Sequence, residues 1–283
     1  MQEIPITEEL FYEIEQLKPS EQRKVLKIIG EQEWNKCADD LLYWLDAKQH
    51  LIPYVYTEDQ KPVYQCNLCA KENIESLSYF HKLDLHLKHY HDIVVDDDKT
   101  RRAYFSSIPL VRPFPMKEYI KPIAEHWLKE QFLFMPKSRD MIATWQIVAY
   151  YTWDTIFHKN RQNFFQSENA PKANYLVKRA HSIWKYQPKF IRDVAKATYT
   201  VNNKSGRLYV PDLDSEIVGL AQGPDQIRMH HPSGVFMDEA AFQEKAGDTF
   251  AAIKPAILAG GRFTAISSAA PGWFAQVCQD KLD

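Results

Sequence analysis

The chain has 283 residues, of which 45% are hydrophobic and 25% charged, a composition that indicates a folded globular protein and excludes an intrinsically disordered one. Its 35 Lys and Arg against 37 Asp and Glu leave a formal net charge of -2, so no whole-chain field attracts nucleic acid, a membrane surface or an acidic substrate. The longest apolar stretch, residues 141–153, is shorter than the roughly 20 residues of a membrane span, and the first residues lack the pattern of a secretory signal, so we expect a cytosolic protein without membrane association.

The first 60 residues predict a helical region. Apolar residues recur at helical spacing around Leu10 and Ile14 and again over residues 25–29, and Pro19 separates the two groups. We therefore expect two or three helices within residues 1–60.

Residues 61–98 have the composition of a small metal-binding module. Cys66 and Cys69 are separated by two residues, so both thiolates of a tight turn can reach one Zn²⁺ ion. His86 and His91 follow on an expected helix, which makes these four side chains the predicted zinc ligands. The pattern resembles a C2H2 zinc finger in which 16 residues, instead of about 12, separate the second cysteine from the first histidine.

Alternatives to this ligand set are open. His89 can serve as the fourth ligand, or the tract is a histidine-rich, solvent-facing helix beside a chance cysteine pair. The metal site is favoured because so short a tract has too few apolar residues to fold without a bound metal ion or another cross-link. A single finger with so few arginines would bind DNA weakly, so a structural or protein-contacting role is equally compatible with the pattern.

Residues 105–283 predict an α/β domain. After Pro109, short apolar runs alternate with amphipathic helical patterns, as repeated βαβ units require, so we expect a mostly parallel sheet flanked by helices. The strands are expected at residues 132–135, 163–166, 208–211, 235–237 and 263–267, and the helices at about 117–129, 142–158 and 171–185.

The strand at residues 132–135 runs into a polar turn and then a long helix, which is where nucleotide-binding proteins hold phosphates. The P-loop pattern G-x4-GK[ST] is not satisfied. With Thr144 at its hydroxyl position, Ala143 occupies the lysine position, and Lys137 and Ile142 occupy the glycine positions. A loop without glycine has no easy access to positive φ, so the match is weak by itself.

Two later strands end in side chains suited to the same chemistry. Asp238 and Glu239 follow the apolar strand at residues 235–237, at the edge where open α/β sheets bind ligands. One carboxylate can hold Mg²⁺ while its neighbour polarises the attacking water, although Asp-Glu pairs also occur at ordinary strand ends. Ser267 and Ser268 end the next strand, where two hydroxyls can sense a γ-phosphate or simply form a turn.

The order and spacing of these motifs resemble the ATPase portion of the large terminase subunit of tailed bacteriophages, the motor that packages DNA. The resemblance covers roughly residues 108–283, with short similar segments near 37–60, and the residues that carry it are 137–145, 166–169, 223–228, 236–242 and 266–272, with Tyr43-Trp44-Leu45 and Arg112-Pro113-Phe114-Pro115 upstream. It implies a P-loop NTPase of the ASCE type, with an extra strand between the two nucleotide-binding strands.

The resemblance also implies roles for individual residues. Lys137 would be a phosphate-binding lysine moved to the front of the loop, and Arg139 an arginine acting in cis on the transition state. Thr144 and Asp238 would hold the Mg²⁺ of the bound ATP, and Glu239 would orient or deprotonate the attacking water.

Three serines complete the implied site. Ser138 lies in the phosphate-binding loop, and Ser267 and Ser268 match the motif that couples hydrolysis to movement. The departures from the family pattern are Ile142, where the family often has glycine, and Asp140, whose charge would repel phosphate unless it turns away.

The implied function is Mg²⁺-dependent ATP hydrolysis coupled to translocation of double-stranded DNA into a procapsid. The implied partners are DNA, the portal protein and procapsid, the small terminase subunit and further copies of the chain, with a pentameric ring expected. The implied location is the host cytoplasm and, transiently, the portal vertex. Because the chain ends about eleven residues after Gly272, we expect no nuclease domain and no DNA cleavage from it.

Two other functions are open at this stage. One is another ASCE NTPase such as a helicase, and the other is a zinc-finger adaptor for DNA or protein whose ATPase fold has decayed. Basic residues on and after the helix at 171–185 can contact DNA phosphates, although such a run is more often a solvated helix face: Lys172, Lys178, Arg179, Lys185 and Lys189.

Overall fold

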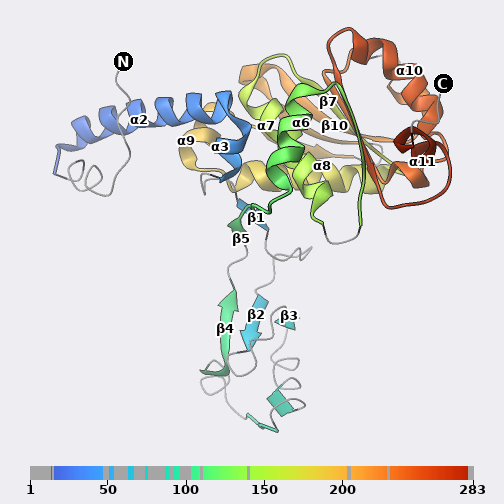
Figure 1. Ribbon diagram of the computed structural model, residues 1–283. Helices are drawn as coiled ribbons and strands as arrows, with labels where there is room; N and C mark the ends of the chain where they lie inside the picture. Colours follow the sequence, from blue (N-terminus) through green and yellow to red (C-terminus); the bar gives the residue numbers. More distant parts are fainter. Residues whose placement is uncertain are drawn as a thin grey trace. The chain divides into compact units, whose positions relative to one another are not determined.

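The computed structural model describes residues 14, 16–46, 51–53, 63–66, 74–75, 87–88, 92–95, 103–108, 111–138, 141–202, 205–227 and 230–279. The chain divides into two compact units, Met1–His50 with Pro115–Asp283 and Leu51–Phe114, and each is described by itself (Figure 1). Within the described residues, no helix has the length and apolar character needed to cross a membrane.

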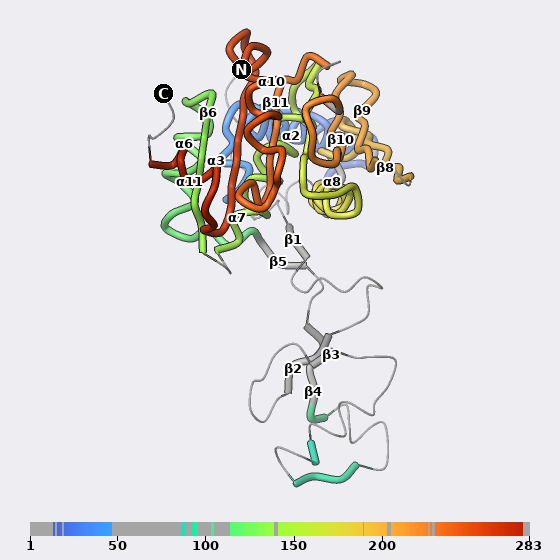
Figure 2. Tube along the Cα trace, turned by 90° about the vertical axis from the view of Figure 1, so that its right-hand side faces the viewer, coloured from blue at the N-terminus to red at the C-terminus, as the bar shows by residue number. Residues whose placement is uncertain are grey.

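A seven-stranded sheet forms the centre of the larger unit (Figure 2), in the order β6-β12-β11-β7-β10-β9-β8. Five neighbouring strands are parallel: β6 (Phe132–Pro136), β12 (Arg262–Ser267), β11 (Gly234–Asp238), β7 (Gln162–Ser167) and β10 (Ser215–Ala221). Two more continue the sheet antiparallel: β9 (Gly206–Val210) and β8 (Thr198–Val201). The mostly parallel sheet is therefore confirmed, and β12 lies between β6 and β11 as the extra strand was expected to.

The helices of this unit are α2 (Pro19–Asp39), α3 (Leu41–Asp46), α6 (Ile120–Lys129), α7 (Ala143–Phe157), α8 (Ala170–Lys185), α9 (Lys189–Val194), α10 (Ala246–Leu258) and α11 (Trp273–Cys278). Three short 3-10 helices join them: η1 (Pro211–Leu213), η2 (Pro224–Gln226) and η3 (Ala240–Phe242). The N-terminal helices expected from the sequence are thus present. They are tied to the α/β core by the indole of Trp153, which donates a 2.6 Å hydrogen bond to the carbonyl of Cys37.

Helices cover both faces of the sheet. Successive strand residues point alternately to these two faces, so each face has its own set of side chains packed against helices. On one face, Tyr151 of α7 packs against Phe236 of β11, with ring centroids 6.2 Å apart. On the other face, Phe250 of α10 packs against Phe132 of β6 and Phe263 of β12, at 5.8 and 5.0 Å. A sheet covered on both faces leaves its carboxyl edge as the place where polar groups gather.

A buried tyrosine fixes α7 against the central strands. The hydroxyl of Tyr151 donates to the carbonyl of Val235 on β11 at 3.0 Å and lies 3.0 Å from the hydroxyl of Thr264 on β12. Thr144 is two turns earlier on the same side of the helix. The hydrogen bonds of Tyr151 therefore set the position of Thr144 relative to the end of β11.

The smaller unit contains short antiparallel strands. β1 (Leu51–Pro53) pairs with β5 (Val111–Pro113), and β2 (Val63–Cys66) lies between β3 (Ile74–Glu75) and β4 (Phe105–Ile108). Of the predicted zinc ligands, Cys66 ends β2, whereas Cys69, His86 and His91 lie outside the described residues. The described part of the chain contains no group of three or more His, Cys, Asp or Glu arranged to hold a metal ion.

Candidate functional site

The carboxyl ends of three parallel strands bring the predicted site residues together. Lys137 follows β6, Ser267 ends β12 and Asp238 ends β11. The register places Ser267 opposite Pro136 and Asp238 opposite Ile266, so the three strands end at nearly the same level. The residues after each strand consequently face one space at the edge of the sheet.

Glu239 is the centre of the contacts in this space. The ammonium of Lys137 forms an ion pair with Oε1 of Glu239 and donates a 3.4 Å hydrogen bond to the hydroxyl of Ser268. The second oxygen, Oε2, accepts hydrogen bonds from the Ser267 hydroxyl at 3.2 Å and the Ser268 N–H at 3.0 Å. The hydroxyl of Ser267 in turn accepts the N–H of Ala241 at 3.1 Å. The ends of β6, β12 and β11 are therefore joined through one carboxylate.

Thr144 and Asp238 form a second pair beside this centre. The hydroxyl of Thr144, in the first turn of α7, donates a 3.1 Å hydrogen bond to Oδ1 of Asp238. A hydroxyl next to a carboxylate is an oxygen donor set that suits Mg²⁺, which takes one or two protein ligands and completes its shell with water and phosphate oxygens. The first N–H groups of α7 have no partner within the helix and favour an anion at its start.

The loop before α7 reaches positive φ without glycine. Ile142 precedes the helix with φ 48°, at the position where the P-loop pattern has its second glycine. A left-handed conformation costs a residue with a Cβ about 1–2 kcal/mol, and a β-branched residue adopts it rarely. The hydroxyl of Tyr119 donates to the carbonyl of Met141 at 2.9 Å and helps to hold the loop in this form. One residue of this loop thus adopts positive φ without being glycine, at the energetic cost that the sequence led us to expect.

The pKa values of Asp238 and Glu239 are shifted in opposite directions. Burial, together with the neighbouring charge of Glu239, raises the pKa of Asp238 from 3.8 to about 6, against the Thr144 hydrogen bond and the charges of Arg179 and Lys137. Burial also disfavours ionisation of Glu239, but its hydrogen bonds from Lys137, Ser268 and Ser267 and the charge of Lys137 outweigh burial and lower its pKa. Glu239 is thus held as a carboxylate, while Asp238 takes up a proton near pH 6.

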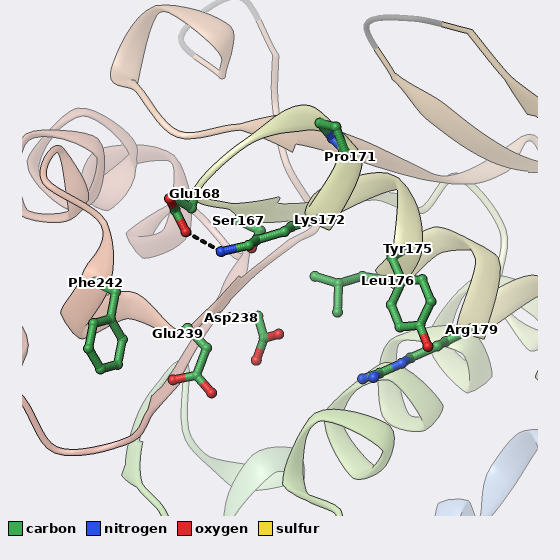
Figure 3. Close-up of a pocket in the computed structure, with 10 residues that line it drawn as sticks. All are labelled: Ser167, Glu168, Pro171, Lys172, Tyr175, Leu176, Arg179, Asp238, Glu239 and Phe242. Atoms are coloured by element: carbon green, nitrogen blue, oxygen red, sulfur yellow. Dashed lines mark hydrogen bonds and ion pairs between the residues drawn. The ribbon is translucent and has the colours of Figure 1, made fainter. Parts of the chain in front are cut away.

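A pocket of about 400 Å³ is lined in part by these two carboxyl groups (Figure 3). Its lining residues come from the end of β7, from one face of α8 and from the segment after β11: Ser167, Glu168, Pro171, Lys172, Tyr175, Leu176, Arg179, Asp238, Glu239 and Phe242. From the sequence, Lys172 and Arg179 of α8 were considered only for contact with DNA phosphates, and their place in this pocket was not predicted.

The other residues predicted to act in the site or on DNA are Ser138, Arg139 and the basic residues on and after α8. Ser138 follows Lys137 and is exposed, and Arg139 lies outside the described residues. Of the basic residues considered for DNA contact, Lys172 forms an ion pair with Glu168, and the guanidinium of Arg179 turns toward aromatic rings. Lys172 is therefore an exposed side chain of a solvated helix face, as the alternative interpretation expected, whereas Arg179 is partly buried.

Comparisons with known proteins find similarity to solved structures only, since no family model and no curated protein matches the chain. The large terminase ATPase domain of Thermus phage P74-26 is 14% identical over 54% of this chain, with a TM-score of 0.42. The HK97 bacteriophage large terminase is 15% identical over 56%, with a TM-score of 0.46. The large terminase of a thermophilic bacteriophage, in complex with ATP-gamma-S, is 12% identical over 59%, with a TM-score of 0.38.

The match spans 66%, 34% and 43% of these three chains, respectively. Identity is low in all three, so the roles of the site residues in this chain rest on its own geometry.

We expect Asp238→Asn to stabilise the protein at neutral pH. Because the folded-state pKa of Asp238 is raised from 3.8 to about 6, the folded protein binds more protons than the unfolded one between these values, and the contribution of Asp238 to stability falls as pH rises through this window. At pH 7.5 the asparagine variant should unfold with a free energy roughly 1–3 kcal/mol above wild type, and the difference should vanish near pH 4.

Urea unfolding at several pH values between 4 and 7.5 measures this difference. Glu239→Gln is the matched control: its lowered pKa contributes stability above the unfolded value, which is lost as pH falls, so glutamine should destabilise the protein at pH 7.5. An Asp238→Asn variant that gains stability on acidification, relative to wild type, would contradict the assignment.

Ile142→Gly and Ile142→Ala test the left-handed loop residue. Both variants remove the same side-chain packing, but only glycine relieves the positive φ of 48°. Glycine should therefore unfold with a free energy about 1 kcal/mol higher than alanine, the reverse of the order at an ordinary helical position. Equal stability of the two variants, or a more stable alanine variant, would show that the residue is not held in this conformation in solution.

Proposed function

We propose that the chain is an Mg²⁺-dependent ATPase of the P-loop, ASCE type. The observation that carries the proposal is the convergence of an ammonium, a carboxylate and a hydroxyl from three strand ends, Lys137, Glu239 and Ser268, at hydrogen-bonding distances beside the Thr144–Asp238 pair. Phosphoryl transfer requires a cation for the phosphates, oxygen ligands for Mg²⁺ and an acceptor that positions water, and each is present at this edge.

Cationic and neutral donors bind the phosphates in this proposal, and oxygen ligands bind the Mg²⁺. The ammonium of Lys137 binds β- and γ-phosphate oxygens together with the free N–H groups at the start of α7. Thr144 and Asp238 would hold Mg²⁺, which would neutralise part of the phosphate charge when the nucleotide is bound. The Ser268 hydroxyl, already 3.4 Å from the Lys137 ammonium, is placed to donate to the γ-phosphate.

Glu239 positions the attacking water. As the water oxygen bonds to the γ-phosphorus, the bond from phosphorus to the bridging oxygen breaks, the electron pair stays on the β-phosphate of ADP, and Glu239 takes a proton from the water. Lys137 lowers the pKa of Glu239 through their ion pair. When Lys137 turns to the phosphates, Glu239 loses this partner and becomes a better base, so nucleotide binding prepares the site for hydrolysis.

We further propose that this ATPase is the motor part of a viral large terminase, which moves double-stranded DNA into a procapsid. The proposal is supported by the resemblance of residues 137–145, 236–242 and 266–272 to that family. It brings the expected partners with it: the portal protein and procapsid, the small terminase subunit and a ring of copies, acting in the host cytoplasm and at the portal vertex. Ser267 and Ser268 contact Glu239 directly, which supports a role in passing the state of hydrolysis to the segment after β12. The roles of Ser138 and Arg139 in the phosphate loop stay proposals from the resemblance alone.

The smaller unit is proposed to bind one Zn²⁺ through Cys66, Cys69, His86 and His91, on the spacing of the four residues. Elemental analysis of purified protein should find one zinc per chain, and the content should fall in Cys66→Ser while Cys278→Ser keeps it. Zinc-free protein with an unchanged helical signal and unchanged melting would contradict a structural zinc site.

Glu239→Gln and Lys137→Ala should each lower the steady-state rate of Mg²⁺-dependent ATP hydrolysis by roughly a hundred-fold or more, because one removes the acceptor for the water and the other the cation on the phosphates. Release of phosphate from ATP, with and without double-stranded DNA, measures the rate. Glu244→Gln, an exposed acid close by in the sequence, is the control and should keep the wild-type rate.

Turnover that persists unchanged in both site variants would refute the assignment of these residues. A wild-type chain that hydrolyses no ATP under either condition would instead favour the adaptor with a decayed ATPase fold.

A further inference from the structure

The pocket that Asp238 and Glu239 line also contains an arginine that has no role in the hydrolysis described above. Arg179 of α8 extends its guanidinium toward the space that Asp238 also faces (Figure 3). The guanidinium carbon lies 5.0 Å from the ring centroid of Trp145 and 4.7 Å from that of Tyr175. Two aromatic rings, one from α7 and one from α8, therefore fix the position of this cation.

One polar atom of the Arg179 guanidinium is unsatisfied within the described part of the chain. Its Nε atom is buried and has no hydrogen-bond partner among the described residues. The other cation of the pocket, Lys172, is already engaged by Glu168. A buried donor without an acceptor costs free energy, and a rigid guanidinium that lacks one is suited to bind an oxyanion.

The positive charge of Arg179 acts on Asp238 at the end of β11. Its charge is one of the influences that lower the pKa of Asp238 against burial. Arg179 and the Mg²⁺ ligands therefore share one electrostatic environment, although they lie on different elements. Mg²⁺ held by Asp238 would offset the charge of that carboxylate, and Arg179 would then be available to an anion in the pocket.

Glu239 lines the pocket that contains Arg179, and it also contacts Lys137 and Ser268. A second, adjoining pocket of about 320 Å³ connects Ser268 and Glu239 with Lys172, so open space surrounds the carboxylate. In an in-line displacement the phosphorus moves away from the leaving oxygen toward the attacking one, and here the attacking water is held by Glu239.

We propose that this pocket receives the phosphate cleaved from the nucleotide, and that Arg179 is the cation that binds it. The proposal rests on the proposed ATPase function and adds the place to which the product moves. Lys172, a lining residue with an exposed side chain, would lie on the path of the released phosphate to solvent.

Titration calorimetry with inorganic phosphate, on the full chain saturated with Mg²⁺-ADP, tests the proposal. We expect the wild type to bind phosphate and Arg179→Gln to bind it at least ten-fold more weakly, with unchanged affinity for Mg²⁺-ADP. Arg179→Met, which keeps the aliphatic stem between the two rings, should show the same loss and serves as the second variant where glutamine disturbs packing. Lys178→Gln makes the same charge change at the next residue of α8, outside the pocket, and should bind phosphate as wild type does.

A second titration separates the two sources of the phosphate group. If Arg179 binds the γ-phosphate before cleavage, Arg179→Gln will weaken Mg²⁺-AMP-PNP relative to Mg²⁺-ADP; if it binds only the released ion, the two nucleotides will keep their wild-type affinities. A wild type that binds Mg²⁺-ADP but no phosphate, or variants that bind phosphate as tightly as wild type, overturn the proposal and leave the ATPase function standing. Failure of Mg²⁺-ADP itself to bind would overturn both.

Discussion

The ion pair between Lys137 and Glu239 is the interaction on which the site depends. It spans the ends of β6 and β11, with β12 between them, and the two serines that end β12 share its carboxylate. A lysine with only 10% of its side chain exposed needs a partner of opposite charge, and the partner here is the residue proposed to position water. A nucleotide that competes for Lys137 therefore changes the hydrogen bonding of Glu239, Ser267 and Ser268 in one event.

Backbone strain accompanies this arrangement at two points. Ile142, directly before α7, and Glu239, directly after β11, both have positive φ, at 48° and 51°. Residues with a Cβ persist in this conformation where the surrounding structure holds them, and such positions cluster at functional sites. Here the holding contacts are the Tyr119 hydroxyl on the loop and the hydrogen bonds and ion pair of Glu239. The fold thus achieves by tertiary contacts what glycine achieves in the usual phosphate loop.

Much of the sheet and the centre of the site were predictable from the sequence, because β6, β7, β11 and β12 are apolar runs that end in polar residues. β10 was missed since Glu216 and Gly219 interrupt its pattern, and α10 was missed since Gly247 and Pro255 lie within it. The Arg179 pocket was beyond sequence reasoning for a different reason. Arg179 contacts Trp145 of α7 and Tyr175 of α8, and no spacing along the chain predicts that a ring from another helix lies beside it.

The most direct measurement of the central claim is a crystal structure of the chain with Mg²⁺, ADP and beryllium fluoride. The ammonium of Lys137 should leave Glu239 and contact the fluoride group that stands in for the γ-phosphate, with Thr144 and Asp238 at the Mg²⁺ and Glu239 facing the attacking position. A nucleotide bound elsewhere, with the Lys137–Glu239 ion pair intact, would contradict the account.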